Sequence, residues 1–274
     1  MRPAINTQSL SLGYGDKLII NDMNIEIPKG EITVFIGANG CGKSTLLRSV
    51  ARLLKPQSGS VLLEGKAIST MSSKDVARKM AILPQSPVAP EGLTVYQLVK
   101  QGRYPYQSWL KQWSSLDEEK VQKAIEATNL TDLKDQAVDE LSGGQKQRAW
   151  IAMTLAQDTD IILLDEPTTY LDMTHQIEIL DLLFDLNEFE NRTIVMVLHD
   201  LNLACRYADN LVALKDGAIH AQGRPEDIIT PELVQHVFSM ECQISFDPIF
   251  GSPMCVPFGK GRYAQRHVKA LANA

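Results

Sequence analysis

The stretch GANGCGKST, residues 37–45, decides the fold of this chain. Gly37, Gly42, Lys43 and Ser44 match the phosphate-binding pattern G-x-x-x-x-G-K-S/T. The glycines let the backbone wrap closely around an anion, and the following helix adds its positive N-terminal end. The pattern therefore predicts a nucleotide site in which Lys43 contacts the β- and γ-phosphates and the hydroxyl of Ser44 binds Mg²⁺.

The residues on either side of this loop supply the strand and the helix that such a site requires. The apolar run ITVFIG, residues 32–37, precedes the loop, and Leu46, Leu47 and Val50 recur after it at helical spacing. We therefore expect a buried strand, the loop, and an amphipathic helix that starts near Lys43. A chance glycine turn, which is the alternative, would lack this context.

Another apolar run, IILLDEP at residues 161–167, ends on the carboxylates Asp165 and Glu166. Beside a phosphate loop, Asp165 is expected to hold Mg²⁺ directly or through water. Glu166, one residue further on, is expected to polarise the water that attacks the γ-phosphate. Taken alone, the pair could simply end a strand and open a loop.

Short apolar runs alternate with helical patterns along most of the chain, which predicts an α/β fold. Strands are predicted at residues 58–65, 79–85, 160–167 and 192–200, with a hairpin at 210–223 that turns at Asp216-Gly217. The runs at 160–167 and 192–200 are continuously apolar, as expected of parallel strands covered on both faces. From about residue 86 to 157 the strand signals fade, and helical patterns occupy 94–104, 117–130 and 143–157. We therefore predict a helical subdomain inserted into an α/β core.

The composition limits the classes of protein to which the chain can belong. Its 274 residues are 44% hydrophobic and 22% charged, which is typical of a globular domain. The net charge of −6 argues against general nucleic-acid binding. The 4 cysteines form no CxxC pair, which indicates a reducing compartment and neither a disulfide framework nor a zinc site. No signal peptide and no apolar run of ~20 residues is evident, so we expect a cytoplasmic protein that docks on a membrane partner if it serves the membrane.

The stretch LSGGQKQR, residues 141–148, resembles the signature motif of ABC-type ATPases. Other motifs of that family occur in the family's order between residues 5 and 223. Tyr14 matches an aromatic residue that stacks on adenine, and Gln85 matches a glutamine that links the metal and the attacking water to the helical subdomain. Asp172 lies in the loop matching one that contacts the opposite subunit, and His199 matches a histidine that contacts the γ-phosphate. Each alone has an ordinary alternative: a surface aromatic, a polar loop residue, or a satisfied histidine at a strand end.

The resemblance also implies a fold and the limits of its subdomains. It implies an α/β P-loop NTPase core with an inserted helical subdomain and an antiparallel β subdomain, in a single cassette over residues 1–259. The core would cover 1–85 and 158–223, the helical subdomain 86–157, and a short C-terminal extension 224–259. The basic tail at 260–274 is expected to be a frayed terminus.

The resemblance also implies a second anion-binding surface. Ser142, Gly143 and Gly144 open a helix, so that free backbone N–H groups face outward. One chain has one phosphate loop and one signature motif, so the family implies a head-to-tail dimer with two ATP molecules between loop and signature. The residues expected to contact ATP are Tyr14, Gly37, Asn39, Gly40, Cys41, Gly42, Lys43, Ser44, Thr45, Ser142, Gly143, Gly144, Gln145 and Asp172. Glu166, His199 and Gln85 are the expected catalytic residues, and Ser44, Gln85 and Asp165 the expected Mg²⁺ ligands.

The use of the ATP energy is inferred from further resemblances. The stretch at 168–183, TTYLDMTHQIEILDLL, resembles the matching segment of importers for iron(III)-siderophores, haem and cobalamin. The stretch GRYPYQ at 102–107 and the C-terminal extension at 224–259 resemble the matching segments of the same group. We expect the ATPase subunit of a bacterial importer of iron(III)-siderophore complexes, peripheral on the cytoplasmic face of the inner membrane. Its expected partners are a second ATPase subunit, integral membrane permease subunits and, indirectly, a substrate-binding protein, with no nucleic acid.

One alternative to this function remains open, and two others are disfavoured. Import of haem or cobalamin would use the same branch of the family. A non-transport ABC switch acting on DNA or ribosomes is disfavoured by the net acidity and by the lack of a coiled-coil insertion, zinc hook or second cassette in the sequence. A nucleotide kinase is disfavoured by the LSGGQ motif.

Four aromatic residues precede the signature motif, and their role is open at the level of sequence. Tyr104, Tyr106, Trp109 and Trp113 lie in the part of the chain expected to receive a helix of the permease. They either anchor that partner or pack the core of the helical subdomain.

Overall fold

The computed structural model describes residues 2–85, 87–108 and 113–260. Its central element is a six-stranded sheet in the order β11-β10-β4-β9-β8-β7. The strands are β4 (Ile32–Ile36), β7 (Met80–Leu83), β8 (Ile161–Asp165), β9 (Thr193–Val197), β10 (Asn210–Lys215) and β11 (Ala218–Gly223). All neighbours pair in parallel except β11, which forms an antiparallel hairpin with β10. The strands and the hairpin predicted from sequence for this sheet are confirmed.

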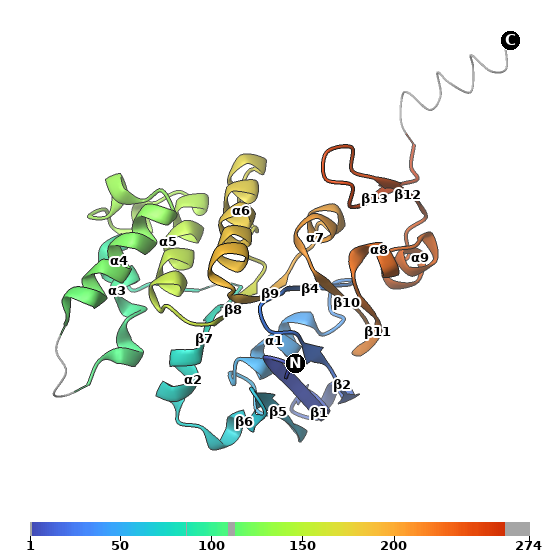
Figure 1. Cartoon of the computed structure of the whole chain (residues 1–274), viewed down its shortest axis with the longest axis horizontal. Helices are drawn as coiled ribbons and strands as arrows, with labels where there is room; N and C mark the ends of the chain where they lie inside the picture. The colour runs from blue at the N-terminus through green and yellow to red at the C-terminus, as the bar shows by residue number, and fades with distance from the viewer. Residues whose placement is uncertain (1, 86, 109–112, 261–274) are drawn as a thin grey trace, which may run out of the picture.

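A second, antiparallel sheet lies beside the first (Figure 1). Its order is β2-β1-β5-β6, with β3 paired to β1. The strands are β1 (Ile5–Tyr14), β2 (Lys17–Met23), β3 (Glu26–Ile27), β5 (Ser58–Leu63) and β6 (Lys66–Ala67). Helix α1 (Lys43–Val50) packs between the two sheets, because Leu46 and Leu47 lie in a shared core with side chains from both.

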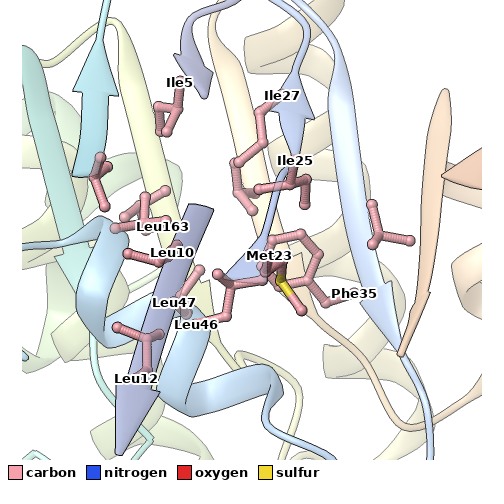
Figure 2. Close-up of a cluster of buried hydrophobic side chains, with 14 of the residues drawn as sticks. Ile5, Leu10, Leu12, Met23, Ile25, Ile27, Phe35, Leu46, Leu47 and Leu163 are labelled. Atoms are coloured by element: carbon pink, nitrogen blue, oxygen red, sulfur yellow. The ribbon is translucent and has the colours of Figure 1, made fainter. Parts of the chain in front are cut away.

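The two faces of the central sheet bury different clusters, which explains its continuously apolar strands. Phe35 of β4 and Leu163 of β8 face α1 and the antiparallel sheet, as Figure 2 shows. Their neighbours Val34, Ile162 and Leu164 face the opposite cluster, which includes side chains of four helices. These helices are α5 (Gly143–Ala156), α6 (Met173–Glu190), α7 (Leu201–Tyr207) and α9 (Pro231–Phe238). Because both faces of the sheet are covered, an alternation of apolar and polar residues along these strands would bury polar side chains.

Between β7 and β8 the chain is helical. It contains α3 (Val95–Gln101), α4 (Ser115–Ala127) and α5, which share a core of their own at one end of the molecule (Figure 1). Each of the three begins with a capping box, formed by Thr94 with Gln97, Ser114 with Asp117, and Ser142 with Gln145. The inserted helical subdomain predicted from sequence is confirmed.

The remaining elements are short. Single-turn 3₁₀ helices span Ile68–Thr70, Tyr104–Tyr106, Thr131–Leu133 and Val138–Glu140, and α2 (Ser73–Lys79) precedes β7. After β11 come α8 (Pro225–Ile228), α9, and the C-terminal hairpin of β12 (Cys242–Phe246) and β13 (Pro253–Pro257). Ser86, Trp109 and all but Lys260 of the predicted tail at 260–274 lie outside the described residues.

A buried arginine just after α3 forms an ion pair with α4 and a hydrogen bond with the end of α5. Arg103 Nε donates to Asp117 Oδ1 at 2.9 Å, its Nη1 donates to the carbonyl of Ala156 at 2.9 Å, and its side chain is 3% exposed. Arg103→Met should lower the free energy of unfolding by about 3–5 kcal/mol, because the carboxylate of Asp117 loses its buried partner. Urea titration followed by circular dichroism measures the loss. Lys123→Met, which breaks the exposed pair with Glu119, is the control and should stay close to wild type; equal losses in both variants would contradict this assignment.

Candidate functional site

The phosphate loop connects β4 to α1 in a backbone shape that requires glycine. Gly37, Gly40 and Gly42 have φ values of 145°, 79° and 108°. A Cβ at Gly37 would lie 2.2 Å from the carbonyl oxygen of Leu214, so any larger residue would displace the loop from β10. Gly42 occupies the N-cap of α1, and no side chain among the described residues caps this helix. The N–H groups of its first turn are therefore available to an anion.

Lys43 lies folded across this loop. Its Nζ donates to the carbonyl oxygens of Gly37 at 2.8 Å and Ala38 at 3.0 Å, and lies 3.8 Å from Cys41 Sγ. The side chain is buried, so its positive charge is held close to the centre of the loop. A phosphate in the loop would therefore meet this ammonium group and the backbone donors together.

Ser44 and Asp165 meet although they lie 121 positions apart in the sequence. The Ser44 hydroxyl donates to Asp165 Oδ1 at 2.8 Å. Asp165 is 1% exposed, and its Oδ2 has no hydrogen-bond partner among the described residues. Burial raises the pKa of Asp165, and the hydrogen bond from Ser44 opposes that rise. A buried, unpartnered carboxylate oxygen beside a hydroxyl is the hard oxygen set that suits Mg²⁺, so the residues fit this ion.

Glu166 and His199 form the second pair of the site. Glu166 Oε1 lies 2.8 Å from His199 Nε2, and Thr169 Oγ1 donates to Glu166 Oε2 at 3.2 Å. Burial opposes ionisation of Glu166, but hydrogen bonds from His199 and Gln85 outweigh it and hold the pKa of Glu166 below its ordinary value. The backbone of Glu166 is left-handed, with φ of 56°. Such strain in a non-glycine residue is typical of a functional turn.

Most of these groups line one cavity of about 560 Å³, whereas Gly37, Cys41 and Asp165 are buried outside its lining. Of the residues predicted from sequence, Asn39, Gly40, Gly42, Lys43, Ser44, Thr45, Gln85, Glu166 and His199 line it. Lys17 and Ile19 of β2 also line it, and sequence reasoning missed both. The one feature of the sequence that could have indicated a role for Lys17 is its basic side chain three positions after Tyr14. Tyr14 itself is 48% exposed and pairs with Lys17 across the hairpin of β1 and β2, outside the described lining of the cavity.

The signature motif lies at the start of α5, outside this cavity. Ser142 Oγ accepts from the N–H of Gln145 at 3.3 Å, and the Gln145 side chain accepts in return from the N–H of Ser142 at 2.9 Å. Ser142 and Gly143 are exposed. A methyl group added at Gly144 would lie 3.3 Å from Leu171 Cδ2, so the signature packs against the loop before α6.

Asp172 caps α6 beside the signature. Its Oδ1 accepts from the N–H of His175 at 3.0 Å, and its side chain is exposed. Sequence reasoning missed Gln147, whose side-chain amide donates to the carbonyl of Pro167 at 3.0 Å. This contact ties α5 to the segment that follows Glu166. The signature residues and Asp172 therefore form one exposed surface, separate from the cavity of the same chain.

The phosphate loop, the paired carboxylates and the inserted helices define the class: the chain is a P-loop ATPase. It matches the family described as ABC transporter over residues 20–169, and it belongs to that family. It is 73% identical over 259 residues to the "Probable siderophore transport system ATP-binding protein YusV" of Bacillus subtilis (strain 168), with 94% of each chain covered. It is 69% identical over 268 residues to the petrobactin import ATP-binding protein FpuD of Bacillus anthracis, with 98% of each covered.

A solved structure supports the same class. The dimeric structure of MJ0796, a bacterial ABC transporter cassette, superposes with a TM-score of 0.73 at 28% identity, covering 80% of this chain and 98% of that chain. The predictions of family, fold class and ATPase activity are confirmed. The chain is an ATP-binding subunit of an ABC transporter, and it resembles the ATPases of iron-siderophore importers.

Proposed function

We propose that this chain is the ATP-hydrolysing subunit of a bacterial importer of iron(III)-siderophore complexes. The observation that carries the proposal is identity of 73% and 69%, over nearly the whole chain, to ATP-binding proteins named for siderophore transport and petrobactin import. Haem and cobalamin remain the alternative cargoes, because this subunit binds ATP and not the cargo. A non-transport switch is disfavoured, because the same relatives are named for transport or import.

Each residue of the site would have its own role in ATP hydrolysis. The backbone of residues 37–42 and the ammonium of Lys43 bind the phosphates. Ser44 and Asp165, with Gln85 nearby, would hold Mg²⁺, which when bound neutralises phosphate charge. Glu166 accepts a proton from the attacking water, and His199, hydrogen-bonded to it, orients the base and contacts the γ-phosphate.

The exposed signature surface supports a dimer. The signature residues and Asp172 do not line the cavity of their own chain. A second subunit would therefore bring its own signature surface over the bound ATP. Tyr14, at the rim, would stack on the adenine. Closure of the pair would shield the γ-phosphate and its attacking water from bulk solvent and complete the catalytic set.

Coupling to the membrane requires further partners. Among the described residues, no helix is both long and apolar enough to cross a bilayer. We propose that the subunit sits on the cytoplasmic face of the inner membrane, bound to permease subunits that receive cargo from a substrate-binding protein. The cassette limits inferred above, 1–259 with the helical subdomain at 86–157 and the extension at 224–259, are part of this proposal.

Within its described residues, the helical subdomain offers one exposed aromatic for the permease. Tyr104 is 68% exposed, whereas Trp113 packs against the core of the helical subdomain and the hydroxyl of Tyr106 donates to the carbonyl of Asp158. Trp109 lies outside the described residues. Tyr104 is therefore our candidate anchor, and Tyr106 and Trp113 serve the subdomain itself.

The importer function is tested by uptake of labelled iron into whole cells. Cells that carry the wild-type gene or Glu166→Gln at the native locus are supplied with several iron(III)-siderophore complexes. We expect loss of uptake for at least one complex in the variant, because hydrolysis drives transport. Unchanged uptake of every complex would refute the siderophore cargo and direct the search to haem or cobalamin.

A further inference from the structure

His199 is placed by the helix that follows it. It lies between β9 and α7, and the next residue, Asp200, caps α7 by accepting from the N–H groups of Asn202 at 2.8 Å and Leu203 at 2.9 Å. The backbone that carries the imidazole is therefore continuous with the first turn of α7. A helix of 7 residues is too short to be stable alone, so its orientation depends on what packs against it.

The C-terminal hairpin (Cys242–Pro257) holds α7 through two side chains that lie four residues apart on one face of the helix. Asn202 Oδ1 accepts from the N–H of Cys255 at 2.8 Å, and Asn202 Nδ2 donates to the carbonyl of Cys255 at 3.3 Å. One side chain thus satisfies both backbone groups of a residue in β13. Arg206 Nη2 donates to Asp247 Oδ2 at 2.6 Å, and its guanidinium lies 4.4 Å from the centre of the Phe250 ring.

Apolar packing fills the space under these polar contacts. Leu201 touches both the core of the central sheet and the small cluster of Val234, Cys242 and Cys255. Burial raises the pKa of Cys205 to about 12, and burial together with a hydrogen bond to Cys242 raises that of Cys255 to about 12. These thiols stay protonated and buried, so they pack as small apolar side chains and do not form a reactive site.

We propose that Asn202 and Arg206 are positioning residues for ATP hydrolysis: through them the C-terminal hairpin fixes α7, and so holds His199 against Glu166. The inference rests on the proposed role of His199. The C-terminal extension, which contains this hairpin, thereby takes part in the chemical step, although no residue of the hairpin lines the described part of the nucleotide cavity. By fixing α7, Asn202 and Arg206 maintain one contact of the site, the 2.8 Å contact between His199 Nε2 and Glu166 Oε1.

The test is the steady-state ATPase activity of the full-length chain. Asn202→Ala should lower kcat by about tenfold and change the KM for ATP by less than about twofold. A displacement of about 1 Å in a catalytic group costs on the order of 100-fold, and with Arg206 still in place the displacement should be smaller. Arg206→Met should act in the same direction. Arg206→Lys, which keeps a cation opposite Asp247, should recover most of the activity.

A double-variant comparison separates positioning from a general loss of structure. In a His199→Ala background, Asn202→Ala should cause no further loss of kcat, because there is no imidazole left to position. Lys215→Ala is the matched control: it breaks a 2.8 Å contact from β10 to the carbonyl of His236 in α9, without touching α7, and should leave kcat unchanged. Thermal unfolding and binding of a fluorescent ATP analogue confirm that each variant is folded.

The outcomes distinguish the two proposals. If His199→Ala lowers kcat and Asn202→Ala leaves it within about twofold of wild type, the positioning inference is wrong and the role of His199 stands. The same loss from Asn202→Ala with and without His199 would also overturn it. If His199→Ala itself leaves kcat unchanged, the proposed role of His199 fails, and the positioning inference fails with it.

Discussion

Glu166→Gln is expected to lower kcat for ATP hydrolysis by roughly 10²- to 10⁴-fold, the usual contribution of a positioned general base, and to leave ATP affinity within about twofold. The carboxylate lines the cavity, lies 2.8 Å from His199 Nε2, and accepts from Thr169 at 3.2 Å. Because its pKa is held below the ordinary value, it is ionised at neutral pH and able to accept a proton. The amide has the same shape but is not basic, so binding persists while the chemical step is lost.

The same variant should accumulate a closed dimer in the presence of ATP and Mg²⁺. Hydrolysis is what reopens the pair, so a chain that binds without hydrolysing stays closed. Phosphate release measures kcat, and size-exclusion chromatography with light scattering measures the dimer. Glu188→Gln, at an exposed position of α6, is the matched control and should behave as wild type. A variant that stays monomeric with ATP, even beside its membrane partner, would contradict the two-subunit site.

The sequence was most informative where one residue type satisfies one physical requirement. The phosphate loop was predictable, because only glycines allow the φ values of residues 37, 40 and 42. The strands β4, β8 and β9 were predictable, because burial on both faces leaves a continuous apolar run. The start of α5 was predictable, because Ser142 and Gln145 form its capping box.

Sequence was least informative where a contact depends on the fold. Nothing local in the chain shows that Lys17 of β2 lines the nucleotide cavity, because β2 meets the phosphate loop only in the folded chain, where Ile20 packs against Gly42. The C-terminal hairpin also escaped prediction, since Pro253, Pro257 and Gly251 interrupt its strand pattern. Its attachment to α7 through Asn202 and Cys255 joins residues 53 positions apart, which only the folded chain reveals.

Lys43→Ala is expected to weaken ATP binding by on the order of 100-fold. The ammonium sits inside the loop, within 2.8 Å of the Gly37 carbonyl and 3.0 Å of the Ala38 carbonyl, so a phosphate held there gains charge-assisted hydrogen bonds from it. Loss of one such bond costs about 1.5–3 kcal/mol, which is roughly one to two powers of ten in affinity. Isothermal titration calorimetry with ATP measures the change.

Two further variants separate loss of the charge from collapse of the loop. Lys43→Met keeps the apolar stem that packs in the loop and should lose nearly as much affinity as Lys43→Ala. Lys55→Ala removes an exposed lysine beyond the end of α1 and should bind ATP as wild type does, so it controls for the change in net charge. Affinity within about threefold of wild type for both Lys43 variants would mean that the backbone N–H groups and the end of α1 bind the phosphates without the ammonium.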